Sequence, residues 1–186
     1  MGPPGGGRNP ISPRTTRHFN YVSLQEMSDS SIALVFNTIL NNFLKPFPDE
    51  VQGVGEGVVE SVIKTFNQVR IDLLPTPEKS HYAFNLRDIA KTVQGCMACT
   101  HKKVATAKDF VRLWVHESRR VFSDRFISYE DVDYFEGLLA KQMDEGFGMN
   151  LKETVPEERL MMVDFLVPGT DFESRIYEES PPMDEL

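Results

Sequence analysis

Apolar residues recur at intervals of three and four positions through most of the chain, which is the spacing of one face of an α-helix. Ser28 and Asn85 precede two of these patterns and are good helix caps. The segments "KPFPDE" and "LLPTPEKS" end the first two patterns, because proline cannot occupy a helix interior. The spacing predicts five helices and hence a mainly α-helical domain, with helices over about residues 28–44, 58–69, 85–98, 106–126 and 129–144.

Each predicted helix has one apolar face, whose residues form the expected core. On the first helix these residues are Ile32, Val35, Phe36, Ile39, Leu40, Phe43 and Leu44. On the second they are Val58, Val59, Val62, Ile63, Phe66 and Val69, and on the third Leu86, Ile89, Ala90 and Val93. The longest helix is expected to turn inward Phe110, Val111, Trp114, Val115, Val121 and Phe122.

The run "FNYVSL", residues 19–24, breaks the helical pattern and predicts one buried β-strand. A strand needs a partner, and no second strand is predicted nearby. We therefore expect its sheet to lie upstream of Met1, in a longer chain of which this sequence is a fragment. "RLMMVDFL", residues 159–166, is a candidate for a second short strand, and "YEESPPMDEL", residues 177–186, is expected to be a frayed tail.

The composition is that of one ordinary globular domain, with 186 residues, 40% hydrophobic and 26% charged. No apolar run is long enough to span a membrane, and no secretory signal is present, so an intracellular protein is expected. Residues 153–186 contain ten acidic and two basic residues and so account for the whole net charge of −8. The remaining chain is neutral overall, which argues against a nucleic-acid-binding protein.

The N-terminal segment has the opposite charge, because Arg8, Arg14 and Arg17 precede the first acidic residue, Glu26. Arg14 and Arg17 are three positions apart, so one helical turn places both on the same side. They are either ordinary surface charges or cations held ahead of the strand and aimed at a neighbour's phosphate, an arrangement called an arginine finger.

Arg87 occupies an unfavourable position in the first turn of the helix that Asn85 caps, because the helix dipole disfavours a cation there. Asp88 would offset this effect. An ordinary ion pair with a nearby acid and a contact with a bound anion are both compatible with this position.

Three other motifs lack the residues that their chemistry requires. "GPPGGGR" has no following lysine, so a flexible turn is favoured over a phosphate loop. Cys96 and Cys99 have no second cysteine pair for zinc and end a helix, so reduced, partly buried thiols are favoured. His116 and Glu117 lack the second histidine of a zinc-peptidase helix, because Arg120 occupies its position. No metal site is predicted.

Three blocks, in order and spacing, resemble the third AAA+ module of dynein heavy chains, with an axonemal rather than cytoplasmic form of the first block. These blocks are "GPPGGGRNPISPRTTRHFN", "LLPTPEKSHYAFNLRDIAKTVQG" and "RLWVHESRRVFSDRF". The resemblance implies a helical AAA+ lid subdomain preceded by the last strand of a truncated α/β AAA+ core. The implied parts are the end of the large subdomain over residues 1–27, the helical linker and lid over residues 28–150, and an acidic extension towards the next module over residues 151–186.

The resemblance also implies roles for individual residues. Arg87 matches the second sensor, a lid arginine that contacts the nucleotide of its own module. Arg17, with Arg14 as the alternative, matches the arginine finger that reaches the nucleotide of the preceding module. Gly2 occupies the first-sensor position, where a polar residue is usual, which favours slow hydrolysis or a regulatory site.

The implied cofactor is ATP or ADP with magnesium, bound by the complete module. The nucleotide loop and the magnesium-binding strand would lie upstream, so this chain alone is expected to be inactive and to bind no nucleotide tightly. The implied function is that of a regulatory module in a microtubule motor of the cytoskeleton, in the axoneme of a cilium or flagellum. The implied partners are neighbouring AAA+ modules, dynein intermediate and light chains, and microtubules, with no nucleic acid or membrane.

Two other hypotheses remain open. A non-enzymatic helical interaction domain would use the arginines and the acidic tail to bind a protein and would need no nucleotide. A separate metal or redox protein would depend on Cys96 and Cys99. Nucleotide titration and metal analysis discriminate among the three.

Overall fold

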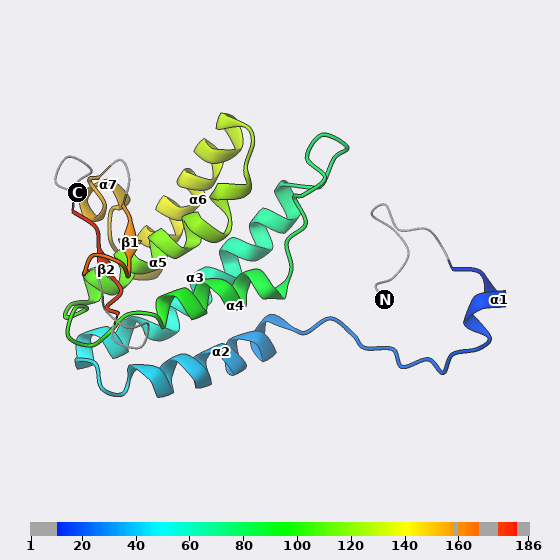
Figure 1. Ribbon diagram of the computed structural model, residues 1–186, viewed down its shortest axis with the longest axis horizontal. Coiled ribbons are helices and arrows are strands. Elements are labelled where there is room, and N and C mark those ends of the chain that lie inside the picture. The colour runs from blue at the N-terminus through cyan, green and yellow to red at the C-terminus, as the bar shows by residue number, and fades with distance from the viewer. Residues whose placement is uncertain (1–10, 158–159, 168–174, 182–186) are drawn as a thin grey trace.

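A computed structural model of the chain describes residues 11–157, 160–167 and 175–181. Gly2 and Arg8 lie outside these residues. Helices dominate, as the apolar pattern predicts (Figure 1). The elements are α1 (Pro13–Thr16), α2 (Asp29–Leu44), α3 (Asp49–Asp72), α4 (Leu86–Cys96), α5 (Ala107–Val121), the 3₁₀ helix η1 (Ser123–Arg125), α6 (Tyr129–Phe147), α7 (Leu151–Thr154), β1 (Met162–Val163) and β2 (Glu178–Glu179).

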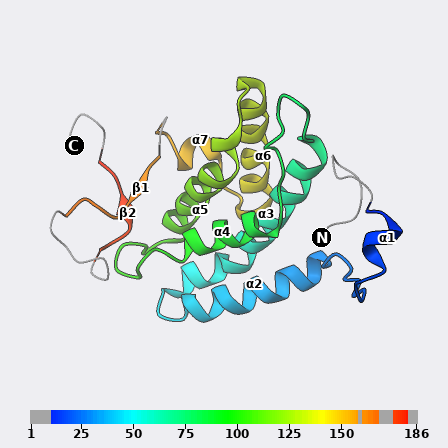
Figure 2. The ribbon, with the colours of Figure 1, turned by 45° about the vertical axis from the view of Figure 1, so that its right-hand side comes forward.

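The core lies where the long helix α3 contacts α2, α4, α5 and α6 (Figures 1 and 2). All six apolar residues predicted on the buried face of α3 are buried. Trp114 and Phe110 of α5 and Phe135 of α6 are completely buried beside them. Burial of such aromatic side chains contributes roughly 1.5–3 kcal/mol each, so this contact holds the domain together.

Local sequence signals set the helix starts. The side chains of Asn85 and Thr106 accept backbone hydrogen bonds in capping boxes at the starts of α4 and α5. α3 begins directly after Pro48, nine residues before the apolar pattern that predicts it. α5 ends at Val121, earlier than predicted, and η1 follows it.

Four residues predicted on apolar helix faces are exposed, which corrects that expectation. Val35 and Ile39 of α2 are 45% and 44% exposed, and Leu86 and Ala90 of α4 are exposed as well. They lie at the edges of their apolar stripes, where no other described element packs on them. Helical spacing alone does not show how wide a stripe the neighbouring helices cover.

The prediction of a buried strand over residues 19–24 is wrong for this chain. The segment contains no strand, and Tyr21, Val22 and Leu24 are 72%, 84% and 87% exposed. Figure 1 shows it as the blue extended stretch between α2 and α1, apart from the helical bundle. Among the described residues no strand lies beside it to form the ladder hydrogen bonds that a sheet requires.

The C-terminal part folds back onto the domain. β1 lies within the predicted second strand and pairs antiparallel with β2, in a register that places Met162 opposite Glu179. Tyr177 forms a bridge with Cys99. The prediction of a frayed tail is therefore wrong for residues 177–179, because pairing with β1 orders them.

In the described part of the chain, no helix combines the length and the apolar character that crossing a membrane requires.

Candidate functional site

The candidate site is the first turn of α4. The Oδ1 atom of Asn85 accepts a hydrogen bond from the backbone N–H of Arg87 at 2.9 Å. Oδ2 of Asp88 accepts one from the backbone N–H of Asn85 at 2.8 Å, which completes the capping box. The helix start is therefore rigid, and Arg87 occupies its second position.

Arg87 is exposed, and its side chain projects from a turn whose own acid is used elsewhere. Over residues 11–157, 160–167 and 175–181, no hydrogen bond or ion pair reaches its guanidinium. The local acid, Asp88, is instead buried and paired with Arg125. Of the two alternatives at Arg87, an ion pair with a described acid is therefore not formed, and the cation is available to an anion.

An open cavity of about 390 Å³ lies beside this turn, between the starts of α2 and α4 and the last turns of α3. Ile32, Phe66 and Phe84 form its apolar part. Its polar lining is held by two contacts, Arg70 to Glu26 at 3.0 Å and Asn67 to Asp29 at 2.9 Å. Figures 1 and 2 show the N-terminal ends of α2 and α4 on the same side of the bundle. The hollow therefore lies beside the helix start, where Asn85 and Leu86 line it, while Arg87, which has no side-chain partner among the described residues, is not part of its lining.

Arg14 and Arg17 lie in and directly after α1, in the helical turn that their spacing predicts. Both are exposed, and Nε of Arg17 donates to Nε2 of His18 at 3.0 Å. Figure 1 shows α1 well away from α4, so the structure does not bring these arginines to Arg87. Neither forms an ion pair with a described carboxylate.

The two cysteines are free, as predicted; Cys96 is completely buried, and Cys99 is 5% exposed. Burial raises the pKa of Cys99 to about 12 and that of Cys96 well above its ordinary value. The thiolate is the reactive form, so both side chains behave as apolar core groups. No cluster of three or more metal-ligating side chains occurs in the part of the chain that the structure describes.

His116 and Glu117 lie on a buried face of α5, with 4% and 8% exposure. Nδ1 of His116 is 3.0 Å from the carbonyl oxygen of Leu160, and Glu117 accepts a hydrogen bond from the hydroxyl of Tyr177. The motif is therefore part of a packed helix face.

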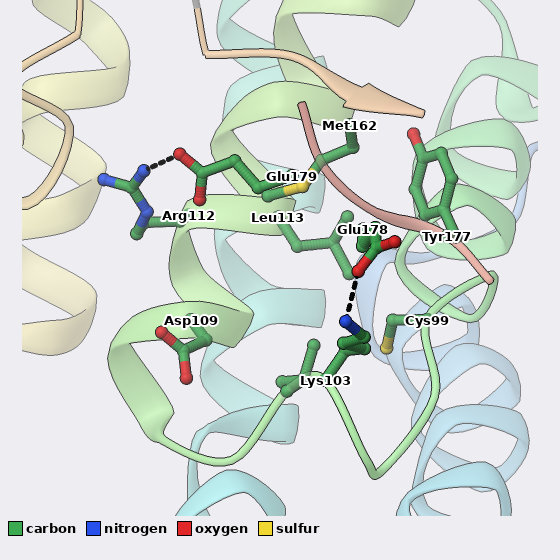
Figure 3. Close-up of a pocket in the computed structure, with 10 residues that line it drawn as sticks. Cys99, Lys103, Asp109, Arg112, Leu113, Met162, Tyr177, Glu178 and Glu179 are labelled. Carbon is green, nitrogen blue, oxygen red and sulfur yellow. Dashed lines mark hydrogen bonds and ion pairs between the residues drawn. The ribbon is translucent and has the colours of Figure 1, made fainter. Parts of the chain in front are cut away.

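Sequence reasoning missed the contacts that hold the C-terminal segment on α5. Arg112 pairs with Glu157 at 3.0 Å and with Glu179, and it donates to the carbonyl oxygen of Thr154 at 2.5 Å. Burial opposes its charge, but the carboxylates of Glu157 and Glu179 raise the pKa of Arg112. Figure 3 shows Arg112 and Glu179 beside a cavity of about 220 Å³, where Lys103 also pairs with Glu178.

No sequence signal could have identified these pairs, because Arg112 is 45 and 67 positions from its two carboxylates. The sequence shows a surplus of acidic residues near the C-terminus, but it does not show which basic side chains bind them.

Comparison with known proteins supports the lid assignment. The AAA+ lid domain family matches residues 58–155. Dynein axonemal heavy chain 6 of Homo sapiens is 40% identical over 184 residues, which cover 98% of this chain and 4% of that protein. Dynein axonemal heavy chain 1 of Mus musculus is 41% identical over 186 residues, which cover 94% of this chain and 4% of that protein. Dynein axonemal heavy chain 12 of Homo sapiens is 37% identical over 196 residues, which cover 97% of this chain and 6% of that protein.

These relatives confirm the resemblance to axonemal dynein heavy chains, and the chain spans only about 4–6% of their length. The family match covers α3 from Val58 onward, α4, α5, α6 and α7, and so includes the start of α4 that carries Arg87. The chain belongs to the AAA+ lid domain family, in the form found in dynein heavy chains.

Proposed function

We propose that this chain is the lid and interface part of a regulatory ATP-binding module in a dynein heavy chain, and that it relays the state of the bound nucleotide around the motor ring. The observation that carries the proposal is Arg87, which is exposed and has no side-chain partner among the described residues, on a helix start that a capping box holds next to an open cavity. The rest of the nucleotide pocket would come from other parts of the heavy chain.

Electrostatics supports a phosphate at this turn. The N-terminus of a helix favours an anion and disfavours a cation, so Arg87, which no described acid pairs with, is stabilised there when a phosphate oxygen binds between its guanidinium and the helix end. Arginine also suits phosphate geometry, because its planar guanidinium can donate two parallel hydrogen bonds. We infer that Arg87 acts as the second sensor and that the cofactor is ATP or ADP with magnesium.

The exposed apolar segment over residues 19–24 supports a missing α/β core. Apolar side chains exposed along an extended backbone are typical of a strand without its sheet. With the sheet in place, Arg14 and Arg17 would be held just ahead of that strand and could reach a neighbouring module's nucleotide. Gly2, at the implied first-sensor position, would offer no side chain to orient water, which favours slow hydrolysis.

The relatives' names place those proteins in the axoneme and describe them as dynein heavy chains. We infer the same setting for this chain, namely the cytoskeleton of a cilium or flagellum. Its partners would be neighbouring AAA+ modules of the same heavy chain, with microtubules and the dynein intermediate and light chains engaged by the whole motor.

The test is nucleotide titration of the complete module that contains this segment. Arg87→Ala is expected to weaken ATP or ADP binding about tenfold or more, because it removes a charged hydrogen-bond donor. Lys91→Ala is the matched control, since Lys91 is an exposed cation one turn further along α4. Unchanged affinity and unchanged motor activity in Arg87→Ala would contradict the sensor role. A complete module that binds no nucleotide would instead favour the helical interaction domain.

The finger role has its own test, which is ATP turnover at the preceding module of the ring. Replacing a true finger arginine by alanine is expected to slow turnover by about 10³-fold or more. Arg17→Ala and Arg14→Ala are compared, and the variant with the large loss identifies the finger. Wild-type turnover in both would exclude the role for this segment.

A further inference from the structure

We propose that Arg125 is a positioning residue for Arg87. Arg125 contacts Asp88 and Phe84, which lie on either side of the cap residue of α4, and thereby fixes the turn that carries Arg87. That Arg87 contacts a nucleotide is taken from the proposed function. That Arg125 positions the turn is argued from the contacts within this chain. Arg125 ends η1, between α5 and α6, and is 37 positions from Asp88 in sequence.

The first contact is with the capping carboxylate. Asp88 is 2% exposed, and its Oδ2 atom caps the N–H of Asn85 while its Oδ1 atom accepts from Nη2 of Arg125. One carboxylate thus joins the start of α4 to η1. A buried carboxylate without a cation is costly, so removing Arg125 would loosen the cap that Asp88 forms.

The second contact lies on the other side of the cap. The guanidinium of Arg125 stacks over the ring of Phe84 at 5.3 Å from its centroid. Phe84 directly precedes Asn85, so Arg125 contacts the chain both just before and just after the helix begins. Phe84 also lines the cavity beside the candidate site, so the same side chain shapes both the turn and its surroundings.

The segment around Arg125 is itself held in place. Nε2 of His81 lies 2.8 Å from the carbonyl oxygen of Arg125, and the hydroxyl of Tyr82 accepts from the N–H of Ile127 at 3.0 Å. That hydroxyl donates in turn to Asp131, at the start of α6, at 2.7 Å. The loop before α4 and the connection between α5 and α6 are therefore one bonded unit, and Arg125 links that unit to the cap.

Arg87 depends on this unit, because the described part of the chain provides no partner for its own side chain. Only the backbone of the first turn determines where its guanidinium can reach. A displacement of α6 relative to α4 would therefore pass through Arg125 and Asp88 to Arg87, which would give the lid a path between its outer helices and the nucleotide.

The experiment is a double-mutant cycle in the complete module, read as ADP affinity. Arg125→Met is expected to weaken ADP binding about fivefold or more, and to have no further effect when Arg87→Ala is already present. Arg119→Met is the matched control, because Arg119 also pairs with a half-buried carboxylate, Glu136, but lies away from the α4 cap. An equal effect of Arg125→Met with and without Arg87 would indicate general destabilisation and overturn the proposal, as would wild-type affinity.

Hydrogen exchange in the 186-residue chain tests the positioning without nucleotide. Amides 87–90 are expected to exchange about tenfold faster in Arg125→Met than in the wild type, and unchanged in Arg119→Met. Arg125→Lys keeps the charge, so its exchange rates are expected to lie between those of the wild type and Arg125→Met. It replaces Arg125→Met if that variant does not fold. Unchanged exchange in Arg125 variants overturns the positioning role. If amide exchange is faster in Arg125→Met but Arg87→Ala leaves the ADP affinity unchanged, the positioning role is supported and only the proposed function is contradicted.

Discussion

The hydroxyl of Tyr177 donates a hydrogen bond to Oε1 of Glu117 at 2.5 Å and so joins the C-terminal segment to the middle of α5. Burial, followed by the hydrogen bond to Glu117, raises the pKa of Tyr177. The hydroxyl therefore stays protonated and can donate at neutral pH. Glu117 is 8% exposed, so water cannot easily replace this donor.

Tyr177→Phe is expected to lower the free energy of unfolding by about 1–3 kcal/mol, because it leaves the buried carboxylate of Glu117 without its donor. Urea denaturation measures the change. Tyr129→Phe is the control, since Tyr129 is 90% exposed, and it should be neutral. Equal stability of the two variants would show that the hydrogen bond to Glu117 contributes nothing.

Gly95→Ala is expected to destabilise the fold by about 1–3 kcal/mol, because the new Cβ would lie 1.9 Å from Oε2 of Glu117 and push the carboxylate away from Tyr177. Gly137→Ala is the matched control. Nothing lies within 4 Å of a Cβ at Gly137, which is inside α6, so alanine there should stabilise by up to about 1 kcal/mol. The midpoints of thermal unfolding should therefore move in opposite directions.

Arg112→Met is expected to release the C-terminal segment from α5. The variant keeps the apolar stem but removes the donor to the carbonyl oxygen of Thr154 and the cation that Glu157 and Glu179 share. Amides 177–179 should then exchange faster, and stability should fall by about 1–3 kcal/mol. Arg120→Met removes only an exposed pair with Asp124 and should change neither value. Full protection of residues 177–179 in Arg112→Met would contradict this account.

The stability of the chain is expected to fall as the pH drops below about 6.5. Burial lowers the pKa of His116, with partly offsetting contributions from the Leu160 carbonyl and Glu117. The folded state therefore holds the imidazole neutral, whereas the unfolded chain binds a proton below about pH 6.5. Because the unfolded state then binds more protons, the free energy of unfolding decreases as the pH falls towards the folded pKa.

His116→Asn tests the origin of this pH dependence. Its side-chain amide can replace the donor to the Leu160 carbonyl but does not titrate. Urea denaturation at pH 7 and pH 5.5 should give a smaller difference for the variant than for the wild type. The same difference in both would assign the pH dependence to other groups.

The start of α4 shows what local sequence determines. The cap at Asn85, the acid at Asp88 and the exposed Arg87 are neighbours in sequence, and they take the geometry that a capping box requires. Apolar spacing likewise predicts α3 and α5, because a helix repeats every 3.6 residues whatever surrounds it. The candidate site residue could therefore be located before any tertiary structure was known.

The partners of this turn could not be located in the same way. Arg125 is 37 positions from Asp88, and Arg112 is 67 positions from Glu179, so no periodic pattern relates them. The absence of a partner strand for residues 19–24 was expected from the sequence, but their exposure was not, since an apolar run has the same sequence whether or not a sheet is present to bury it.

The sequence by itself determined the helices, their caps and the cation at the start of α4, because each depends on contacts within a few residues. Only the tertiary structure decided that Asp88 is held by Arg125, that Arg87 has no partner within the described part of the chain, and that Glu179 of the acidic C-terminal segment pairs with Arg112 of α5. These contacts depend on how whole helices pack. The attraction between two charged side chains depends on their distance in space and not on their separation in sequence, so the sequence does not reveal which of them meet.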